Sequence, residues 1–193
     1  MRVLVIGATG TIGRAVTREL EPRHEILRAS RNGPLTADLT DPASLDALLA
    51  GTGPLDAVVC CAASGPLVPL TDLDAVGDAE FAAGLHGKLL GQIALTRRAA
   101  THLAAPASLT LTAGTFPGPL PDGSLGALVN SALEGFVRNA AHELPPGVRL
   151  NAVSPGWVRE TLGSPTEGTP AAQVARVYAD LVEGDGTGEV VRV

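Results

Sequence analysis

The chain has 193 residues, a formal net charge of −6 and two cysteines. This length predicts one domain over residues 1–193, with a core large enough to fold without disulfides. An acidic chain without a basic stripe argues against a nucleic-acid partner. No apolar run approaches the ~20 residues of a membrane span, and the first predicted strand starts at residue 1, which leaves no room for a signal peptide. We therefore expect a cytoplasmic protein that binds neither nucleic acid nor membrane.

The chain opens with an apolar strand, residues 1–6, followed by the turn Gly7-Ala-Thr-Gly10-Thr-Ile-Gly13 and a helix at 14–20. A helix that begins directly after a buried strand presents unpaired N–H groups and the positive end of its dipole. Glycines let that backbone approach a phosphate closely. This arrangement predicts a cradle for a dinucleotide pyrophosphate. The alternative, a glycine-rich turn without a nucleotide, is disfavoured by the strand and helix spacing that follows.

The rest of the chain alternates strands and helices. Predicted strands cover residues 24–30, 35–37, 56–63, 108–112, 149–153 and 188–193, and predicted helices cover 41–50, 78–103, 125–144 and 170–182. Asp41 fits the N-cap of its helix and Pro42 the first position. The alternation predicts an α/β fold of Rossmann type, a doubly wound parallel sheet of about seven strands with helices on both faces. Cys60 and Cys61 should point to opposite faces of their strand as small hydrophobes, without a metal or disulfide.

With these motifs the chain resembles the short-chain dehydrogenase/reductase family, from Gly7 to the segment Asn151-Ala-Val-Ser-Pro-Gly-Trp157. The resemblance implies that Asp38 contacts adenine and that Pro155-Gly156 holds the nicotinamide carboxamide. The predicted cofactor-binding residues are Gly7, Thr9, Gly10, Thr11, Ile12, Gly13, Ser30, Arg31, Asp38, Leu39, Cys61, Ala62, Ala63, Lys88, Pro155, Gly156, Trp157 and Val158.

The choice between NADH and NADPH follows from the residues after the second strand. An NAD site has an acidic residue about 20 positions beyond the glycine turn, where it binds the ribose 2′-hydroxyl. This chain has Ser30-Arg31-Asn32 there. A guanidinium binds a 2′-phosphate through paired hydrogen bonds, so NADPH/NADP+ is favoured. The alternative for Arg31 is a solvated loop arginine.

The family's Tyr-x-x-x-Lys motif is absent, because the only tyrosine is Tyr178 and the only lysine is Lys88. Aligned on the family's active-site helix, Gly126 takes the tyrosine position and Asn130 the lysine position. The catalytic serine falls at Ala113 or Gly114. The hydroxyls beside that position belong to Thr112 and Thr115.

Lys88 maps to the family's helix-four asparagine. A desolvated ammonium loses its proton more readily, so Lys88 is a candidate to protonate a carbonyl as hydride arrives, or to bond the cofactor ribose. The other interpretation is a lysine that extends to solvent. The candidate catalytic residues are Lys88, Thr112, Thr115 and Asn130, with Asn130 also able to reach the ribose.

The resemblance also implies a homodimer through the two long helices. Gly84, Gly87 and Gly91 permit close approach of a partner helix, and Glu134 is expected to face that partner. The hypothesis favoured is an NADP(H)-dependent oxidoreductase for a small carbonyl or alcohol substrate. The alternatives are an NADPH-binding protein without redox turnover, as a sensor or partner subunit, and a non-redox enzyme on the same scaffold.

Overall fold

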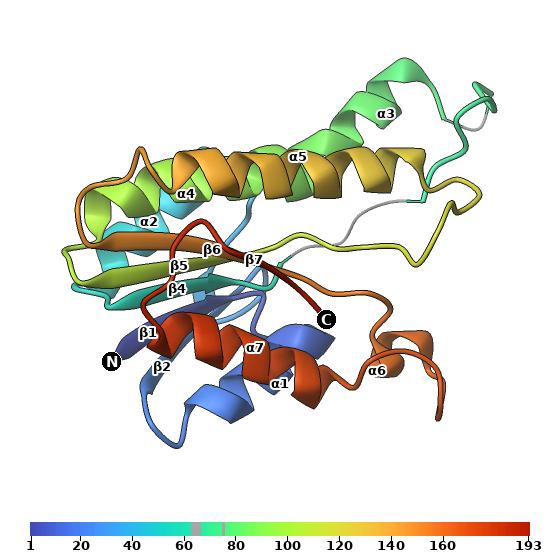
Figure 1. Cartoon of the computed structure of the whole chain (residues 1–193). Helices are drawn as coiled ribbons and strands as arrows, with labels where there is room; N and C mark the ends of the chain where they lie inside the picture. Colours follow the sequence, from blue (N-terminus) through green and yellow to red (C-terminus); the bar gives the residue numbers. More distant parts are fainter. Residues whose placement is uncertain (63–66, 75) are drawn as a thin grey trace.

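The computed structural model describes residues 1–62, 67–74 and 76–193. Within these residues, seven strands form one parallel sheet in the order β3-β2-β1-β4-β5-β6-β7 (Figure 1). The strands are β1 (Arg2–Ile6), β2 (Glu25–Ser30), β3 (Leu35–Thr36), β4 (Ala57–Cys60), β5 (Ala107–Thr112), β6 (Val148–Ser154) and β7 (Val190–Arg192). The predicted Rossmann-type doubly wound sheet is therefore confirmed.

Helices cover both faces of the sheet (Figure 1). One face carries α2 (Pro42–Thr52), α4 (Gly91–His102) and α5 (Ser124–Ala140), and the other carries α1 (Thr11–Leu20) and α7 (Ala171–Glu183). The helix α3 (Asp78–Leu85) continues through a π-helical turn, η1 (His86–Leu90), into α4. A single turn, α6 (Arg159–Leu162), follows β6. Both α3 and α6 lie at the end of the sheet toward which the strands run.

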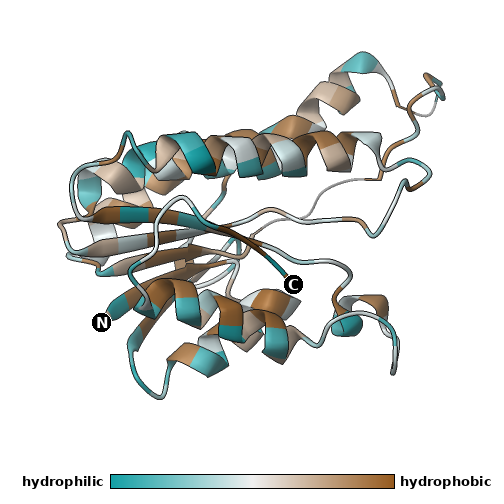
Figure 2. Cartoon of the chain, viewed as in Figure 1, coloured by the Kyte–Doolittle hydropathy of each residue, from teal (hydrophilic) through white to brown (hydrophobic). Residues whose placement is uncertain are grey.

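The alternation of side chains along each strand divides the apolar residues between two cores. Ile6 packs with the helices α2, α4 and α5, whereas Val5 packs with α1 and α7. Cys60 lies in the first core and Cys61 packs against the second, so the predicted opposite orientation of these free cysteines is confirmed. Figure 2 shows the apolar strands enclosed between helices with hydrophilic outer faces.

The helix predicted over residues 78–103 is interrupted by η1. There the amide of Gly91 bonds the carbonyl of His86, five residues earlier, which shifts the helix faces by one residue. Periodicity does not reveal such a turn, because the apolar residues remain roughly in phase on either side. Lys88 lies in the middle of η1.

Two other boundaries differ from the prediction. The strand β4 ends at Cys60 rather than at residue 63, and Ala63 lies outside the described residues. The helix α5 ends at Ala140, and the following residues up to Leu144 form turns before the prolines. By contrast, the predicted N-cap is confirmed, since the carboxylate of Asp41 accepts a hydrogen bond of 2.9 Å from the amide of Ala43.

Two glycines shape the turn between β1 and α1. Gly7 has a φ of +81°, and a Cβ there would lie 2.6 Å from the amide nitrogen of Ala62. A Cβ at Gly13 would lie 2.0 Å from the carbonyl oxygen of Gly7. Neither position accepts a side chain, so the first turn of α1 packs directly on the end of β1. Its unpaired N–H groups then face the space beyond the sheet.

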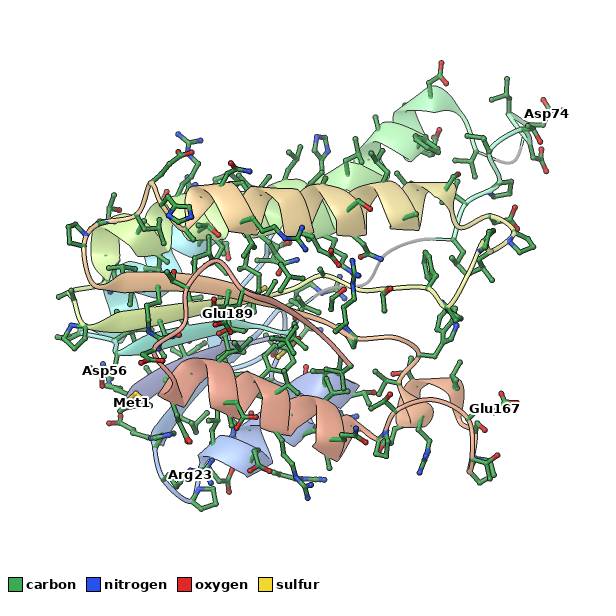
Figure 3. All side chains as sticks on the ribbon, in the orientation of Figure 1. Met1, Arg23, Asp56, Asp74, Glu167 and Glu189 are labelled. Carbon is green, nitrogen blue, oxygen red and sulfur yellow. The ribbon has the colours of Figure 1, made fainter. Side chains whose placement is uncertain are left out.

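Charged side chains lie mainly on the outside of the molecule. Figure 3 shows Arg23, Asp74 and Glu167 at the periphery, pointing away from the sheet. Within the described residues, no helix combines the length and apolar character that crossing a bilayer requires.

Gly13→Ala should destabilise the protein by about 3 kcal/mol, because the new methyl group has to displace backbone. Gly135→Ala is the matched control, since a Cβ there meets no described atom within 4 Å. It should stabilise α5 by about 0.5–1 kcal/mol through helix propensity. Urea unfolding measures both free energies, and equal effects at the two positions would contradict the packing described for Gly13.

Candidate functional site

A pocket of about 440 Å³ lies above the carboxyl ends of β1 and β2. It is the larger of two neighbouring cavities, called here the outer pocket. Its lining includes these residues predicted from the sequence: Gly7, Thr9, Gly10, Thr11, Ile12, Ser30, Arg31, Asp38, Leu39, Cys61 and Ala62. The glycine turn forms its floor, where the dipole and free N–H groups of α1 favour a phosphate. Gly13 is the exception, because it packs under the turn against Gly7 and does not line the pocket.

Arg31 and Asp38 supply the charges of the outer pocket. Arg31 is exposed and has no hydrogen bond or ion pair with the described residues, so its guanidinium is free for a ligand. Asp38 accepts bonds from the hydroxyl of Thr40 at 2.7 Å and its amide at 2.9 Å. These bonds, with a smaller contribution from Arg31, lower the pKa of Asp38. No acidic side chain stands at the end of β2, so the local residues fit a 2′-phosphate.

A second cavity of about 200 Å³, the inner pocket, lies beside the first. Its lining includes the predicted residues Ile12, Lys88, Thr112, Thr115, Asn130, Pro155, Gly156, Trp157 and Val158. Ala113, Gly114 and Gly126, the positions that replace the family's serine and tyrosine, line the same cavity. The two pockets share Ile12 and Thr161 in their walls. A ligand with two ends, such as a dinucleotide, can therefore extend from one into the other.

Lys88 is buried in the wall of the inner pocket, with 6% of its surface exposed. Its Nζ donates to the carbonyl of Ala113 at 2.7 Å and to Oδ1 of Asn130 at 2.8 Å. Burial lowers the pKa of Lys88 to about 8. Of the two interpretations of Lys88, the lysine that extends to solvent is therefore wrong. An ammonium has three N–H donors, and the third has no partner among the described residues.

In the mapping that the family resemblance implies, Lys88 takes the position of the family's asparagine and Asn130 that of its lysine. The cationic side chain now comes from η1, and the amide comes from α5. Because the two side chains bond each other, the exchange keeps one amine and one amide at this end of the sheet. The amine therefore projects from η1 and not from α5. The same mapping puts Gly126, which has no side chain, at the position of the tyrosine, and Gly126 lines the inner pocket.

Gln92 holds this arrangement in place and was missed by the sequence analysis. Its side chain is fully buried, and its Oε1 accepts from the amide of Thr112 at 2.8 Å. Its Nε2 donates to the carbonyls of Thr112 at 2.9 Å and Lys88 at 3.1 Å. The pairing of β5 with β4 stops at Thr110. Gln92 therefore supplies the hydrogen bonds that a longer β4 would have made.

The hydroxyl of Thr112 makes its hydrogen bonds inside the protein core. It donates to the carbonyl of Cys60 and pairs with the hydroxyl of Tyr178, which is fully buried on α7. The predicted catalytic role of this hydroxyl is therefore not supported. Burial also raises the pKa of Tyr178 well above its ordinary value, so the only tyrosine is neutral and structural. Thr115 stays in the wall of the inner pocket.

Two residues that were expected at a partner surface pack within the chain instead. Gly91 accommodates its own chain, because a Cβ there would lie 2.7 Å from the carbonyl oxygen of Leu39. Glu134 is buried and binds within the chain, with Ser154 at 2.8 Å and Arg192 at 2.9 Å.

Sequence reasoning also missed Thr161, which borders both pockets, and Phe116, whose ring lies 5.8 Å from that of Trp157. No local sequence signal marks either residue. Among the described residues, no group of three or more metal-ligating side chains is present.

The family model described as enoyl-(acyl carrier protein) reductase matches residues 8–191. The protein lin1944 from Listeria innocua is 34% identical with a TM-score of 0.92, over 100% of this chain and 99% of that one. A short chain dehydrogenase from Mycobacterium smegmatis is 25% identical with a TM-score of 0.86, over 100% and 91% of the two chains.

The chain belongs to the short-chain dehydrogenase/reductase family. It is therefore an oxidoreductase-family protein with a site for a nicotinamide cofactor. A small-chain dehydrogenase solved in complex with NADPH has the same fold, with a TM-score of 0.86 and 24% identity over 100% of this chain and 96% of that one.

Among curated proteins, divinyl chlorophyllide a 8-vinyl-reductase of Zea mays is 43% identical over 83 residues, 32% of this chain and 21% of that protein. The chain thus spans about a fifth of the length of that relative.

Gln92→Leu should destabilise the protein by about 2–5 kcal/mol, because the buried amide and carbonyl of Thr112 each lose a partner. Thr96→Val is the control. Its hydroxyl donates only to the Gln92 carbonyl, which keeps its place in the helix, so the cost should stay below about 1 kcal/mol. Chemical denaturation gives both values, and a Gln92 variant as stable as the control would remove this residue as the support of β5.

Proposed function

We propose that the protein is an NADP(H)-dependent oxidoreductase that reduces the carbonyl of a small substrate, with Lys88 as the proton donor. The observation that carries the proposal is the anchoring of Lys88. Two of its N–H groups bond Ala113 and Asn130, and the third is directed to no described residue in the wall of the inner pocket.

The cofactor assignment rests on the residues of the two pockets. The glycine turn and the first turn of α1 would hold the pyrophosphate. Arg31 would hold the 2′-phosphate, and Asp38 the adenine end. Pro155 and Gly156 line the inner pocket, in support of a nicotinamide there. The chemistry that a bound NADPH supplies is hydride transfer to a carbonyl carbon.

Lys88 can keep its two hydrogen bonds in both of its protonation states. As an ammonium it holds Ala113 and Asn130 with two hydrogens and offers the third to a carbonyl oxygen. As a neutral amine it keeps both bonds and presents its lone pair in the same direction. Its position therefore does not change when the proton leaves. A pKa of about 8 leaves the group mainly protonated at neutral pH and still able to release its proton.

A second candidate function is NADPH binding without turnover. The observation in its favour is Gly126, which leaves the position of the family's tyrosine without a side chain. The resemblance further implies a homodimer, which we retain as a proposal. Leu90 on η1 and Leu128 on α5 are exposed apolar residues that support it.

Arg31→Ala should weaken NADPH binding about 10- to 100-fold, because charge-assisted hydrogen bonds to the 2′-phosphate are lost. NADH binding should not change. The control is Arg28→Ala, which removes an arginine of β2 that pairs with Glu21 outside the pocket. Calorimetric titration measures all four affinities, and an equal loss for both nucleotides would contradict the role of Arg31.

Lys88→Met should reduce carbonyl turnover about 10²- to 10⁴-fold while NADPH still binds. In the unaltered protein, kcat/KM for carbonyl reduction should fall as the pH rises through about 8, where the ammonium is lost. Alcohol oxidation needs the neutral amine and should rise over the same range. NADPH absorbance follows both directions. Retained turnover in Lys88→Met, or a kcat/KM for reduction that does not change across this pH range, would favour another proton donor. NADPH binding without turnover in the unaltered protein would favour the second candidate function.

A further inference from the structure

We infer that the inner pocket binds a carboxylate next to the reacting carbonyl, so that the substrates are 2-oxo acids and the corresponding 2-hydroxy acids. This inference rests on the proposed function, whose substrate class it specifies. It follows from the charge balance around Lys88 and from the donors that remain free there.

Among the described residues, the ammonium of Lys88 has no counter-ion. Both of its bonded acceptors, the Ala113 carbonyl and the Asn130 amide oxygen, are neutral. No acidic side chain is among the described residues of the inner pocket. Cys60 on β4 is the titratable group that acts on Lys88, and burial raises the pKa of this thiol to about 12, so it is neutral. Buried charges are normally paired, so a lone buried ammonium favours an anionic ligand.

Glu134, one turn after Asn130 on α5, is not the counter-ion of Lys88. Glu134 bonds the hydroxyl of Ser154 at 2.8 Å and the guanidinium groups of Arg192 at 2.9 Å and Arg138 at 3.3 Å. Its charge is therefore balanced by two arginines. It does not line the inner pocket.

Two neighbouring hydrogen-bond donors have no acceptor among the described residues. One is the third N–H of Lys88. The other is the Nδ2 group of Asn130, because an ammonium can only donate and the amide oxygen must therefore face Lys88. Nδ2 has no partner among the described residues. A 2-oxo acid presents two adjacent oxygens, one on the carbonyl and one on the carboxylate, which match this pair of donors.

Other residues of the inner pocket favour the same ligand. Gly126 lies in the first turn of α5, one turn before Asn130, and brings no side chain to the wall. The positive end of that helix dipole adds to the potential of Lys88. Phe116 and Trp157 supply an apolar rim for the rest of a small substrate.

The chemistry balances without a further reactant. A hydride adds to C2 of the 2-oxo acid from NADPH, which is oxidised to NADP+, and Lys88 gives one proton to the carbonyl oxygen. The product is a 2-hydroxy acid. Solvent returns the proton to Lys88.

The first test compares the reduction of pyruvate with that of its methyl ester and of butane-2,3-dione, which are uncharged and similar in size. The kcat/KM for pyruvate should exceed those of the neutral compounds about 10- to 100-fold, mainly through KM. Asn130→Asp is the matched variant. It places a carboxylate beside Lys88 as an internal counter-ion, so it should abolish or invert this preference.

The second test does not depend on turnover. Because Lys88 is the only lysine, protein labelled with ¹³C-lysine gives one side-chain signal whose pH titration reports the Lys88 pKa directly. Oxamate, an unreactive isostere of pyruvate, should raise that pKa by about one unit or more in the protein saturated with NADPH, since an adjacent anion favours the charged form. Butane-2,3-dione should leave it unchanged.

The outcomes separate the two proposals. If the neutral compounds are reduced as well as pyruvate, the carboxylate site is overturned while the oxidoreductase function stands. If no carbonyl is reduced but oxamate raises the Lys88 pKa, the anion site stands and the redox function fails. If NADPH alone raises the pKa as far as oxamate does, the counter-ion belongs to the cofactor and the inference is overturned.

Discussion

The candidate site depends on which groups hydrogen-bond the backbone at the end of β5, where its pairing with β4 has ended. In a parallel sheet every buried amide and carbonyl needs a partner, and β5 continues to Thr112 while its pairing with β4 ends at Thr110. The amide of Gln92 fills this gap on one side of the backbone, and the hydroxyl of Thr112 bonds the last residue of β4. This arrangement presents the carbonyl of Ala113 to Lys88. The position of the amine is thus a consequence of a strand that is longer than its neighbour.

The π turn is the second part of the same arrangement. By inserting one residue, η1 turns Lys88 toward β5 and Gly87 toward the outer pocket, while Gln92 on α4 still reaches the carbonyl of Lys88. In the proposed mechanism, the buried amine of Lys88 takes the place of the family's tyrosine. A phenol and an ammonium both offer a proton, but the ammonium carries a positive charge before it does so. That charge is the basis of the anion preference that we propose for the inner pocket.

Several features could be predicted because they depend on neighbouring residues alone. The strand and helix alternation, the cap at Asp41 and the opposite orientation of Cys60 and Cys61 follow from periodicity and local hydrogen bonding. The outer pocket followed from the glycine turn, whose chemistry is contained in a single βα unit. Lys88 was singled out by composition, because a lone lysine among arginines indicates a need for an amine.

The amino-acid sequence by itself determined the Rossmann-type sheet, the place of the outer pocket at the glycine turn and the absence of the family's tyrosine and lysine motif. Only the tertiary structure decided that Lys88 is buried, that its partner is Asn130, and that Thr112 and Glu134 turn away from the roles expected of them. The physical reason is separation along the chain. Lys88, Ala113 and Asn130 meet only when two helices and a strand pack together, and burial and charge balance are properties of that packing. No local pattern records them.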